Sequence, residues 1–399
     1  MQKQTGAIIL IAGTCIGSGM IALPMLLVKL GIIPSVLLML LIWSIIYYTS
    51  LVNIELNLQA GDGLSLGALG KKFSGKIAEL IGTISFKILS YSLLAVYIYG
   101  GSSILQKILE SSITSELSFN YIASFYALIS ITILLLPMKL LDYVNRILFT
   151  GMLAVVTILV AGIISTINWS NLPLFTENYA NISIWKMAAP VVFTTFGFQV
   201  IFHTLTNYCN KNAKLLKRAF FWGSLIPAIV YIIWTCSILG VIHQDSPLFY
   251  NQMINGEVEV GDLIKELSNI AKWPLVQYII WCISSFAIIT SVLGVGLGLC
   301  DTIKAMLPSK MKNRFLAAIL SILPAYFLAI VIPNAFIAVL GFAGMILVVI
   351  AILLPIYLLS KLKSSKFYYP ELKSKWLIIL AAIAGILIII CELFNMANR

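Results

Sequence analysis

Two short segments place helix-breaking residues in the middle of long apolar stretches. The first, GTCIGSGMIALP at residues 13–24, holds three glycines and a proline. The second, PVVFTTFGFQ at residues 190–199, has two threonines and a glycine near its centre. Each glycine costs a helix interior about 1 kcal/mol relative to alanine. Both segments are therefore expected to interrupt a helix.

An interrupted helix offers backbone groups that can bind a ligand. Unwinding at Gly17, Ser18 and Gly19 would free amides at the positive end of a half-helix, and such amides suit a carboxylate. Unwinding near Thr194 and Thr195 would free carbonyl oxygens, which suit an ammonium. An α-amino acid carries both groups side by side. The alternative for either segment alone is a kink, or close helix packing through small residues.

Composition places the chain in a membrane. Of its 399 residues, 60% are hydrophobic and 10% are charged, which is typical of a polytopic membrane protein and excludes a soluble domain of this size. The basic residues lie in short loops between apolar stretches, which favours membrane topology over nucleic-acid binding. The six cysteines show no CxxC spacing and are interpreted as small apolar residues, so neither a disulfide framework nor a metal site is expected.

Runs of about 20 apolar residues predict eleven membrane-spanning helices. They lie at about 5–28, 32–58, 77–109, 120–138, 145–167, 184–207, 218–242, 272–303, 314–332, 334–360 and 376–396. Most of the 26 Lys and Arg residues fall in the loops on the side of the membrane that holds the N-terminus. By the positive-inside rule, the N-terminus is then cytoplasmic and the C-terminus is periplasmic or extracellular.

The two interrupted segments lie in the first and sixth predicted spans, and each of these spans opens a unit of five. Because five is odd, the second unit enters the membrane from the opposite side. This pattern predicts one transporter domain over 1–399, with a first repeat at 5–167, an inverted repeat at 184–360 and an extra helix at 376–396. Interrupted spans in corresponding positions of two repeats indicate the binding site of a secondary transporter.

Several motifs resemble those of the bacterial hydroxy/aromatic amino acid permeases. They are the two interrupted segments, DYVNRILF (142–149), SVLGVGLGLCD (291–301) and LGFAG (340–344). The resemblance covers essentially the whole chain. It implies the LeuT-type 5+5 fold of the amino acid–polyamine–organocation superfamily. It also implies import of tyrosine, tryptophan or phenylalanine across the bacterial inner membrane, with a proton as the coupling cation.

The resemblance also implies a set of substrate-binding residues on four spans. They are Gly17, Ser18, Gly19, Tyr91, Tyr97, Phe193, Thr194, Thr195, Phe196, Gln199 and Phe342. The glycine segment would hold the carboxylate, the carbonyls of residues 193–195 would hold the ammonium, and Phe196 would close over the substrate. The tyrosines would hydrogen-bond to or stack on the aromatic ring. Ordinary helix packing is the alternative for any one tyrosine.

Gln199 is a departure from the pattern, because several family members carry His at that position. His203 lies one turn later on roughly the same face and is a candidate proton-coupling group. The alternative for His203 is an ordinary polar residue near the cytoplasmic end of its span. Lys87 lies inside the third span and is a candidate for coupling or gating. The alternative for Lys87 is a side chain that snorkels to the interface.

Two further sets of residues are candidates for coupling and gating. In this fold a sodium ion is often held at the place of Thr290 and Ser291, although hydroxyls in membrane helices commonly bond their own backbone. Glu55, Arg146 and Asp301 match family positions near the cytoplasmic ends of their spans. They would form an inner-gate ion-pair network, and the alternative is plain interfacial charge.

No motif in the chain predicts an enzyme. GVGLGL (294–299) lies inside a predicted span without a preceding strand, so it is not a dinucleotide fingerprint. The leading hypothesis is a cation-coupled importer of aromatic amino acids working by alternating access. The alternatives are a sodium-coupled or broader neutral amino acid transporter, and an amino acid sensor or channel on the same fold. The expected partners are the aromatic substrate and the lipid bilayer, with no cofactor, nucleic acid or obligate protein partner.

Overall fold

The structure, a computed structural model, contains helices and connecting loops. It describes residues 2–112, 118–136, 168–270, 274–332, 336–362 and 366–398, together with 140, 143, 147–148, 150–151, 153–154 and 156–157. No β-strand occurs in these ranges. The all-helical class that the composition predicts is therefore confirmed for this part of the chain.

Among the described residues, thirteen helices, long and short, lie at the predicted spans to within a few residues. They are α1 (Gln2–Cys15), α2 (Ser18–Leu27), α3 (Ile32–Ala60), α5 (Lys76–Ser112), α6 (Phe119–Leu135), α8 (Ile182–Thr195), α9 (Phe202–Tyr208), α10 (Ala213–Asp245), α13 (Pro274–Met306), α14 (Arg314–Val331), α15 (Phe336–Val348), α16 (Leu354–Ser360) and α17 (Lys375–Ala397). A 3₁₀ turn, η2 (Phe198–Ile201), precedes α9, and a π-helical turn, η4 (Val349–Leu353), joins α15 to α16. The short helices in the loops are α4 (Leu66–Ser74), α11 (Pro247–Asn255) and α12 (Val260–Ile270), with 3₁₀ turns η1 (Trp169–Asn171), η3 (Ser309–Met311) and η5 (Pro370–Lys373).

Length and apolar composition identify membrane-spanning helices. Among the described residues, eight helices are long and apolar enough to cross a bilayer, and the bent pair α1 and α2 makes a ninth such span. Helix α6, with 17 residues, is apolar but shorter. The predicted span at 145–167 lies mostly outside the described residues, so the count of eleven and the 5+5 arrangement stay predictions.

Local sequence signals explain where several helices begin and end. The side chain of Asn212 accepts a hydrogen bond from the Leu215 amide at 3.0 Å, and Asn313 accepts one from the Leu316 amide at 2.7 Å. These are N-caps, which satisfy amides that have no acceptor within their own helix. Helix α3 ends at Ala60 and is followed by Gly61, whose φ of 74° lies in the left-handed region that favours glycine.

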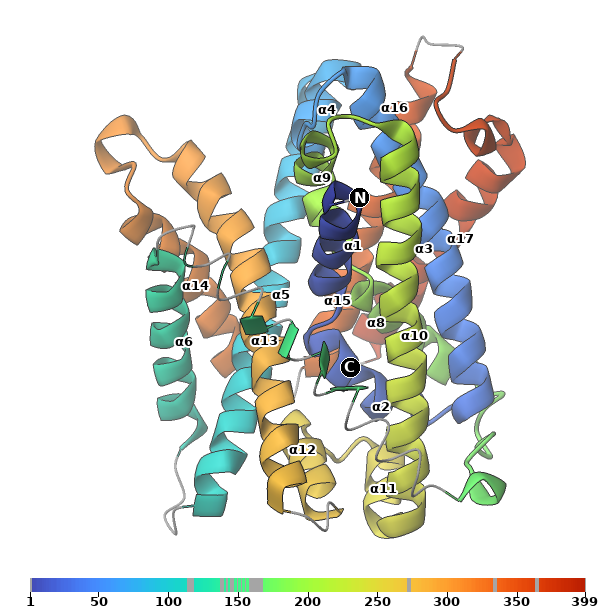
Figure 1. The fold of residues 1–399 in the computed structure, drawn as a ribbon, viewed down its shortest axis with the longest axis vertical. Helices are drawn as coiled ribbons and strands as arrows, with labels where there is room; N and C mark the ends of the chain where they lie inside the picture. Colours follow the sequence, from blue (N-terminus) through green and yellow to red (C-terminus); the bar gives the residue numbers. More distant parts are fainter. Residues whose placement is uncertain are drawn as a thin grey trace.

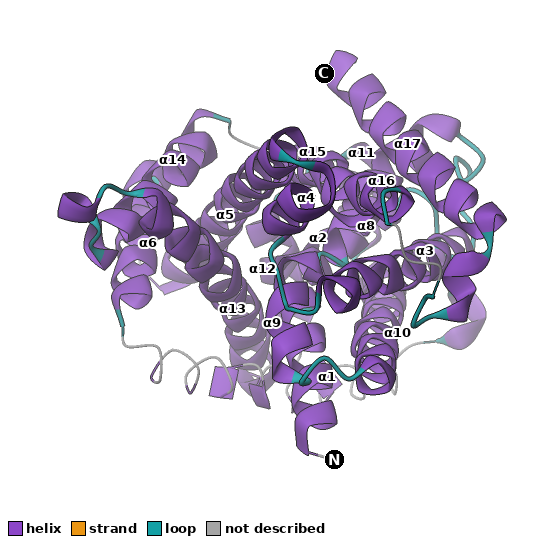
Figure 2. Cartoon of the chain, turned by 90° about the horizontal axis from the view of Figure 1, so that it is seen from above, coloured by secondary structure: helices purple, strands orange, loops and turns teal. Residues whose placement is uncertain are grey.

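The bundle has two distinct ends. Figure 1 shows α4 and α9 at one end and α11 and α12 at the opposite end, and we call these the α4 end and the α12 end. Seen from above, α6 and α14 form one outer side and α17 lies on the other (Figure 2). The interrupted helices lie inside the bundle, where α2 packs on α8, α10 and α13, and α8 packs on α3 and α15.

Helix α12 is amphipathic and lies across its end of the bundle, packed on α2, α5 and α13. The Gly261 amide donates to Ser103 Oγ at 3.1 Å, and Lys107 Nζ lies 3.1 Å from the Asp262 carboxylate. Burial, and next the charge of Asp262, raises the pKa of Glu259 in the loop that precedes α12. These contacts fasten the start of α12 to α5.

Proline inside a helix leaves the carbonyl four residues earlier without its usual donor. In α16, Pro355 cannot donate to the carbonyl of Ala351, and the helix adopts the π-helical turn η4 just before it. The Asn53 side chain on α3 donates its Nδ2–H to this carbonyl at 3.1 Å. An amide from a second helix therefore replaces the missing backbone donor.

The same replacement occurs in α8. Pro190 leaves the carbonyl of Lys186 without its donor, and Asn395 Nδ2 on α17 donates to that oxygen at 3.0 Å. This hydrogen bond joins the last helix of the chain to the first half of the interrupted sixth span. The contact gives α17 a structural role although much of its surface is exposed.

A third case involves a predicted substrate residue. In α14, Pro324 leaves the carbonyl of Leu320 without its donor, and the Tyr91 hydroxyl on α5 donates to it at 2.9 Å. In hydrocarbon an unpaired backbone group costs several kcal/mol. In this structure the Tyr91 hydroxyl therefore stabilises the packing of α5 on α14, which is the alternative to substrate binding that the sequence leaves open for the tyrosines.

We expect Tyr91→Phe to lower the thermal stability of the purified protein, because it leaves the Leu320 carbonyl unpaired. Such groups cost about 1–3 kcal/mol in protein interiors, and hydrogen bonds between membrane helices average near 0.6 kcal/mol. The unfolding midpoint in a fluorescence scan should fall by about 1–4 °C.

Tyr126→Phe is the matched control. The Tyr126 hydroxyl is buried and has no hydrogen-bond partner among the described residues, so its removal should leave the midpoint unchanged or slightly higher. Equal losses in the two variants would contradict the role given to Tyr91.

Candidate functional site

The first span is broken where the glycines indicate. Helix α1 ends at Cys15 and α2 begins at Ser18, and the two axes differ in direction by 51°. Ile16 and Gly17 lie between them outside any helix. The first turn of α2 therefore presents the amides of Ser18 and Gly19, which have no acceptor within their own helix.

The sixth span is interrupted as well, one to two residues later than the sequence predicts. Helix α8 ends at Thr195, Phe196 and Gly197 lie outside it, and the chain continues through the 3₁₀ turn η2 into α9. The Gly197 amide turns back to the Thr194 carbonyl at 3.0 Å. The 3₁₀ geometry after it explains how the chain crosses this region with little change of direction.

The two interruptions touch each other. A Cβ atom added at Gly19 would lie 2.8 Å from Thr195 Cγ2 and 3.1 Å from Thr195 Cα. A side chain at position 19 would force Thr195 to shift. The residue type at Gly19 is therefore set by the close approach of the two interrupted helices.

A single side chain ties the two interruptions together. The Tyr231 hydroxyl on α10 lies 2.5 Å from the Cys15 carbonyl and 2.9 Å from the Thr195 carbonyl, and its single hydrogen is shared between the two in a three-centre hydrogen bond. Tyr231 is fully buried, and its ring packs edge-on against Phe196 at 5.3 Å. It satisfies the carbonyl ends of α1 and α8, where both helices stop.

A small cavity of about 30 Å³ lies between the two interruptions. It is lined by residues of α1, α2, α5, α8, α13 and α15: Thr14, Cys15, Gly17, Gly19, Leu93, Tyr97, Thr194, Thr195, Gly197, Ser291, Val295 and Leu340. We call it the central cavity. Its volume admits water but not an amino acid.

Six residues predicted for substrate or cation binding meet at this cavity: Gly17, Gly19, Tyr97, Thr194, Thr195 and Ser291. The rings of Phe193 and Phe196 are fully buried in packing and do not line it. Phe342 and Tyr91 line neither the central cavity nor the larger cavity described below. The side chain of Ser18 lies outside what the structure describes.

The hydroxyls proposed for a sodium site bond their own helix. Thr290 donates to the Phe286 and Ala287 carbonyls at 2.9 and 3.0 Å, and Ser291 donates to Ala287 at 2.8 Å. The hydroxyl oxygens keep lone pairs that could coordinate a cation, so the sodium site stays a prediction. Lys87 is half-buried and lines neither cavity.

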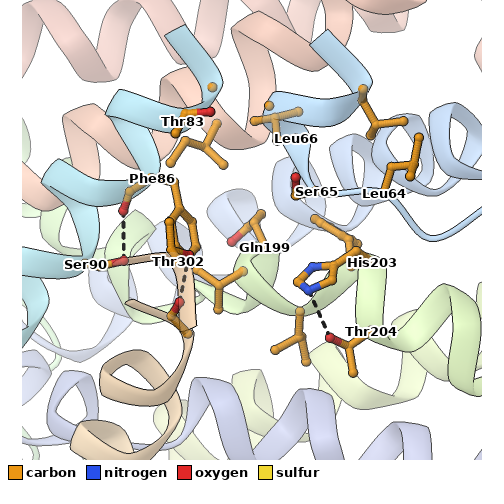
Figure 3. Close-up of a pocket in the computed structure, with 18 of the residues that line it drawn as sticks. Leu64, Ser65, Leu66, Thr83, Phe86, Ser90, Gln199, His203, Thr204 and Thr302 are labelled. Carbon is orange, nitrogen blue, oxygen red and sulfur yellow. Dashed lines mark hydrogen bonds between the residues drawn. The ribbon is translucent and has the colours of Figure 1, made fainter. Parts of the chain in front are cut away.

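A second cavity of about 490 Å³ lies toward the α4 end, and we call it the vestibule (Figure 3). Its walls come from α3, α4, α5, η2, α9 and α13. Gln199 and His203 line the vestibule instead of the central cavity, and His203 Nε2 contacts the Thr204 hydroxyl at 3.2 Å. Val295 lines both cavities, so they are neighbours.

Glu55 and Asp301, two of the three predicted inner-gate residues, lie in different surroundings in the described structure. The buried Glu55 carboxylate accepts hydrogen bonds from Gln59 Nε2 and from the amides of Tyr368 and Tyr369, at 2.7–3.2 Å. Asp301 is exposed and lines the vestibule. Arg146 lies outside the described residues, so their ion-pair network stays a prediction.

Comparison with known proteins identifies the family. The chain matches the tryptophan/tyrosine permease family over residues 1–392. The chain belongs to this family. The resemblance of its motifs is thus confirmed, as is the expectation that the protein is a membrane permease and not an enzyme.

Relatives of the chain differ in the substrate for which they are named. The permease is 30% identical over 373 residues to tyrosine-specific transport system 1 of Haemophilus influenzae, which covers 93% of this chain and 91% of that one. It is 27% identical over 367 residues to glutamine transporter 2 of Aliivibrio fischeri, with 91% and 90% covered. It is 25% identical over 402 residues to the low affinity tryptophan permease of Escherichia coli K12, with 98% and 95% covered.

Tyr231 is the residue of this permease site that the sequence does not single out. A tyrosine in the seventh predicted span has no local signal that distinguishes it from ordinary packing. Its importance depends on two carbonyls from spans far away in the chain, which only the fold brings together.

We expect Tyr231→Phe to loosen both interruptions, because the Cys15 and Thr195 carbonyls lose their donor. An unpaired buried carbonyl costs about 1–3 kcal/mol, and 1.4 kcal/mol corresponds to a factor of ten. Amide hydrogen exchange measured by mass spectrometry should become about tenfold faster in residues 16–20 and 196–199. The Tyr126→Phe variant is the control and should leave exchange in these segments unchanged. Unaltered exchange in Tyr231→Phe would show that the Tyr231 hydroxyl does not hold the two interruptions.

Proposed function

We propose that this permease imports aromatic amino acids, namely tyrosine, tryptophan or phenylalanine, across the bacterial inner membrane. The observation that carries the proposal is the meeting of two interrupted spans at one central cavity in a chain of this family. Relatives named for tyrosine and tryptophan support the aromatic class. In this proposal the α2 amides bind the carboxylate, and the ammonium binds on the α8 side of the cavity.

The proposed cycle is alternating access in a 5+5 inverted repeat with an extra C-terminal helix. Spans one, two, six and seven would rock against spans three, four, eight and nine. The large vestibule toward the α4 end and the position of α12 across the other end support an inward-facing state. This assignment takes the N-terminus as cytoplasmic, in line with the distribution of basic residues.

The coupling cation is proposed to be a proton, with sodium as the alternative. His203 is the titratable candidate and lines the vestibule, while Ser291 and Thr290 are the candidates for sodium. A cation that binds only one state would shift the conformational equilibrium by its difference in affinity. Uptake at two pH values, with and without sodium, separates the two ions.

A broader neutral amino acid transporter is the second candidate. The specific observation that favours it is the relative named for glutamine, which is about as similar to this chain as the tryptophan permeases are. Competition by all twenty amino acids against labelled tyrosine uptake in proteoliposomes tests both candidates. Inhibition by Tyr, Trp and Phe alone supports the aromatic class, and inhibition by glutamine supports the broader one.

We expect Gly19→Leu and Thr195→Pro to reduce uptake to background while both proteins still insert into the membrane. A side chain at Gly19 would overlap Thr195, and proline at 195 would disrupt the last turn of α8. The measurement is uptake of labelled tyrosine into proteoliposomes, normalised to inserted protein.

Gly151→Leu is the matched control, since an added Cβ at Gly151 meets nothing within 4 Å among the described residues. It should transport like the wild type. Normal transport by Gly19→Leu or Thr195→Pro would show that the substrate does not bind at these interruptions.

A further inference from the structure

Gln199 is a buried polar side chain with unused hydrogen-bonding capacity. Its relative exposure is 6%, and neither Oε1 nor Nε2 has a hydrogen-bond partner among the described residues. Figure 3 shows the side chain directed into the vestibule, between Phe86 and Thr302 on one side and His203 on the other. A buried amide without partners is costly, so this arrangement indicates a position that a ligand completes.

Several other polar side chains around the vestibule already have partners. Ser90 Oγ donates to the Phe86 carbonyl and Thr302 Oγ1 donates to the Gly298 carbonyl, both at 2.8 Å. Asn57 donates to the Asn53 carbonyl and accepts from the Leu64 amide. Among the side chains that line the vestibule, the Gln199 amide is the buried group whose donor and acceptor are both unpaired in the described structure, so both are available to a ligand.

The size and charge of the vestibule fit a zwitterion with an aromatic side chain. Its volume of about 490 Å³ lies within the range of small-molecule sites. Asp301 contributes a carboxylate, and no Lys or Arg is among the described residues that line the cavity. The half-buried ring of Phe86 adds an aromatic wall beside Gln199.

The vestibule lies next to the central cavity along the chain and in space. Gly197 lines the central cavity, and Gln199, two residues later, lines the vestibule. Val295 lines both. A ligand that leaves the central cavity toward the α4 end therefore meets Gln199 early on its way.

We propose that the vestibule is a second binding site for the transported amino acid, in which Gln199 hydrogen-bonds the phenol hydroxyl or indole N–H of the side chain. Asp301 supplies the counter-charge for the ammonium. The identity of the ligand rests on the proposed function. Phenylalanine would bind this site more weakly than tyrosine, because it leaves the Gln199 amide unpaired.

The test measures equilibrium binding of labelled tyrosine and phenylalanine to the purified full-length protein in lipid nanodiscs. Gly19→Leu fills the central cavity and isolates the vestibule. In that background we expect one bound tyrosine per chain and at least tenfold weaker binding of phenylalanine. Adding Gln199→Met should weaken tyrosine binding about tenfold and leave phenylalanine nearly unchanged, which removes the preference.

Gln199→His serves as the conservative variant, because a neutral imidazole also offers one donor and one acceptor. It should retain the preference for tyrosine, which separates the hydrogen bond from a general effect on folding. Loss of all tyrosine binding in Gly19→Leu would overturn the second site, and so would a tyrosine preference that survives Gln199→Met. A separate measurement tests the proposed function itself: if it is wrong, proteoliposomes that contain the wild-type protein will accumulate no aromatic amino acid.

Discussion

A backbone carbonyl that loses its helical partner inside a bilayer has no water to replace it, and each such group costs several kcal/mol. Side chains from distant helices meet this requirement at several places in the described structure. Asn53, Asn395 and Tyr91 supply donors to carbonyls that prolines leave unbonded. Tyr231 does so for the carbonyl ends of both interrupted helices. At these places another helix supplies the missing group, and the hydrogen bonds link helices that are distant in the sequence.

The same requirement explains the shape of the site. Because one hydroxyl holds the Cys15 and Thr195 carbonyls, the two interruptions lie in contact and enclose a cavity of only about 30 Å³. The vestibule toward the α4 end is many times larger. The volume of the vestibule therefore suffices for an amino acid, whereas the central cavity would have to expand to admit one. Expansion requires movement between α2 and α8, whose contact at Gly19 and Thr195 leaves no free space.

Much of this architecture is predictable from the sequence, because lipid imposes simple rules on it. Apolar runs predict the long described helices to within a few residues but not the short helices α4, α11 and α12, and helix-breaking residues predict both interruptions. What the patterns do not predict depends on contacts between distant spans. The role of Tyr231 is one example, since its two acceptors belong to spans one and six. The placement of Gln199 in the vestibule and of Glu55 against the loop at Tyr368 are others. Rotation about the helix axis decides these cases, and an apolar helix in lipid has too little amphipathic contrast to reveal it.

The hydroxyl that joins the two interrupted helices is electrically neutral. Moving one elementary charge through the membrane potential involves about 2.3 kcal/mol per 100 mV. A metal ion holding the same two carbonyls would add this voltage dependence to every rearrangement of the helices. With Tyr231 in that position, the junction itself experiences no such force. The contact between the two interrupted helices therefore carries no net charge on which the electric field across the membrane could act.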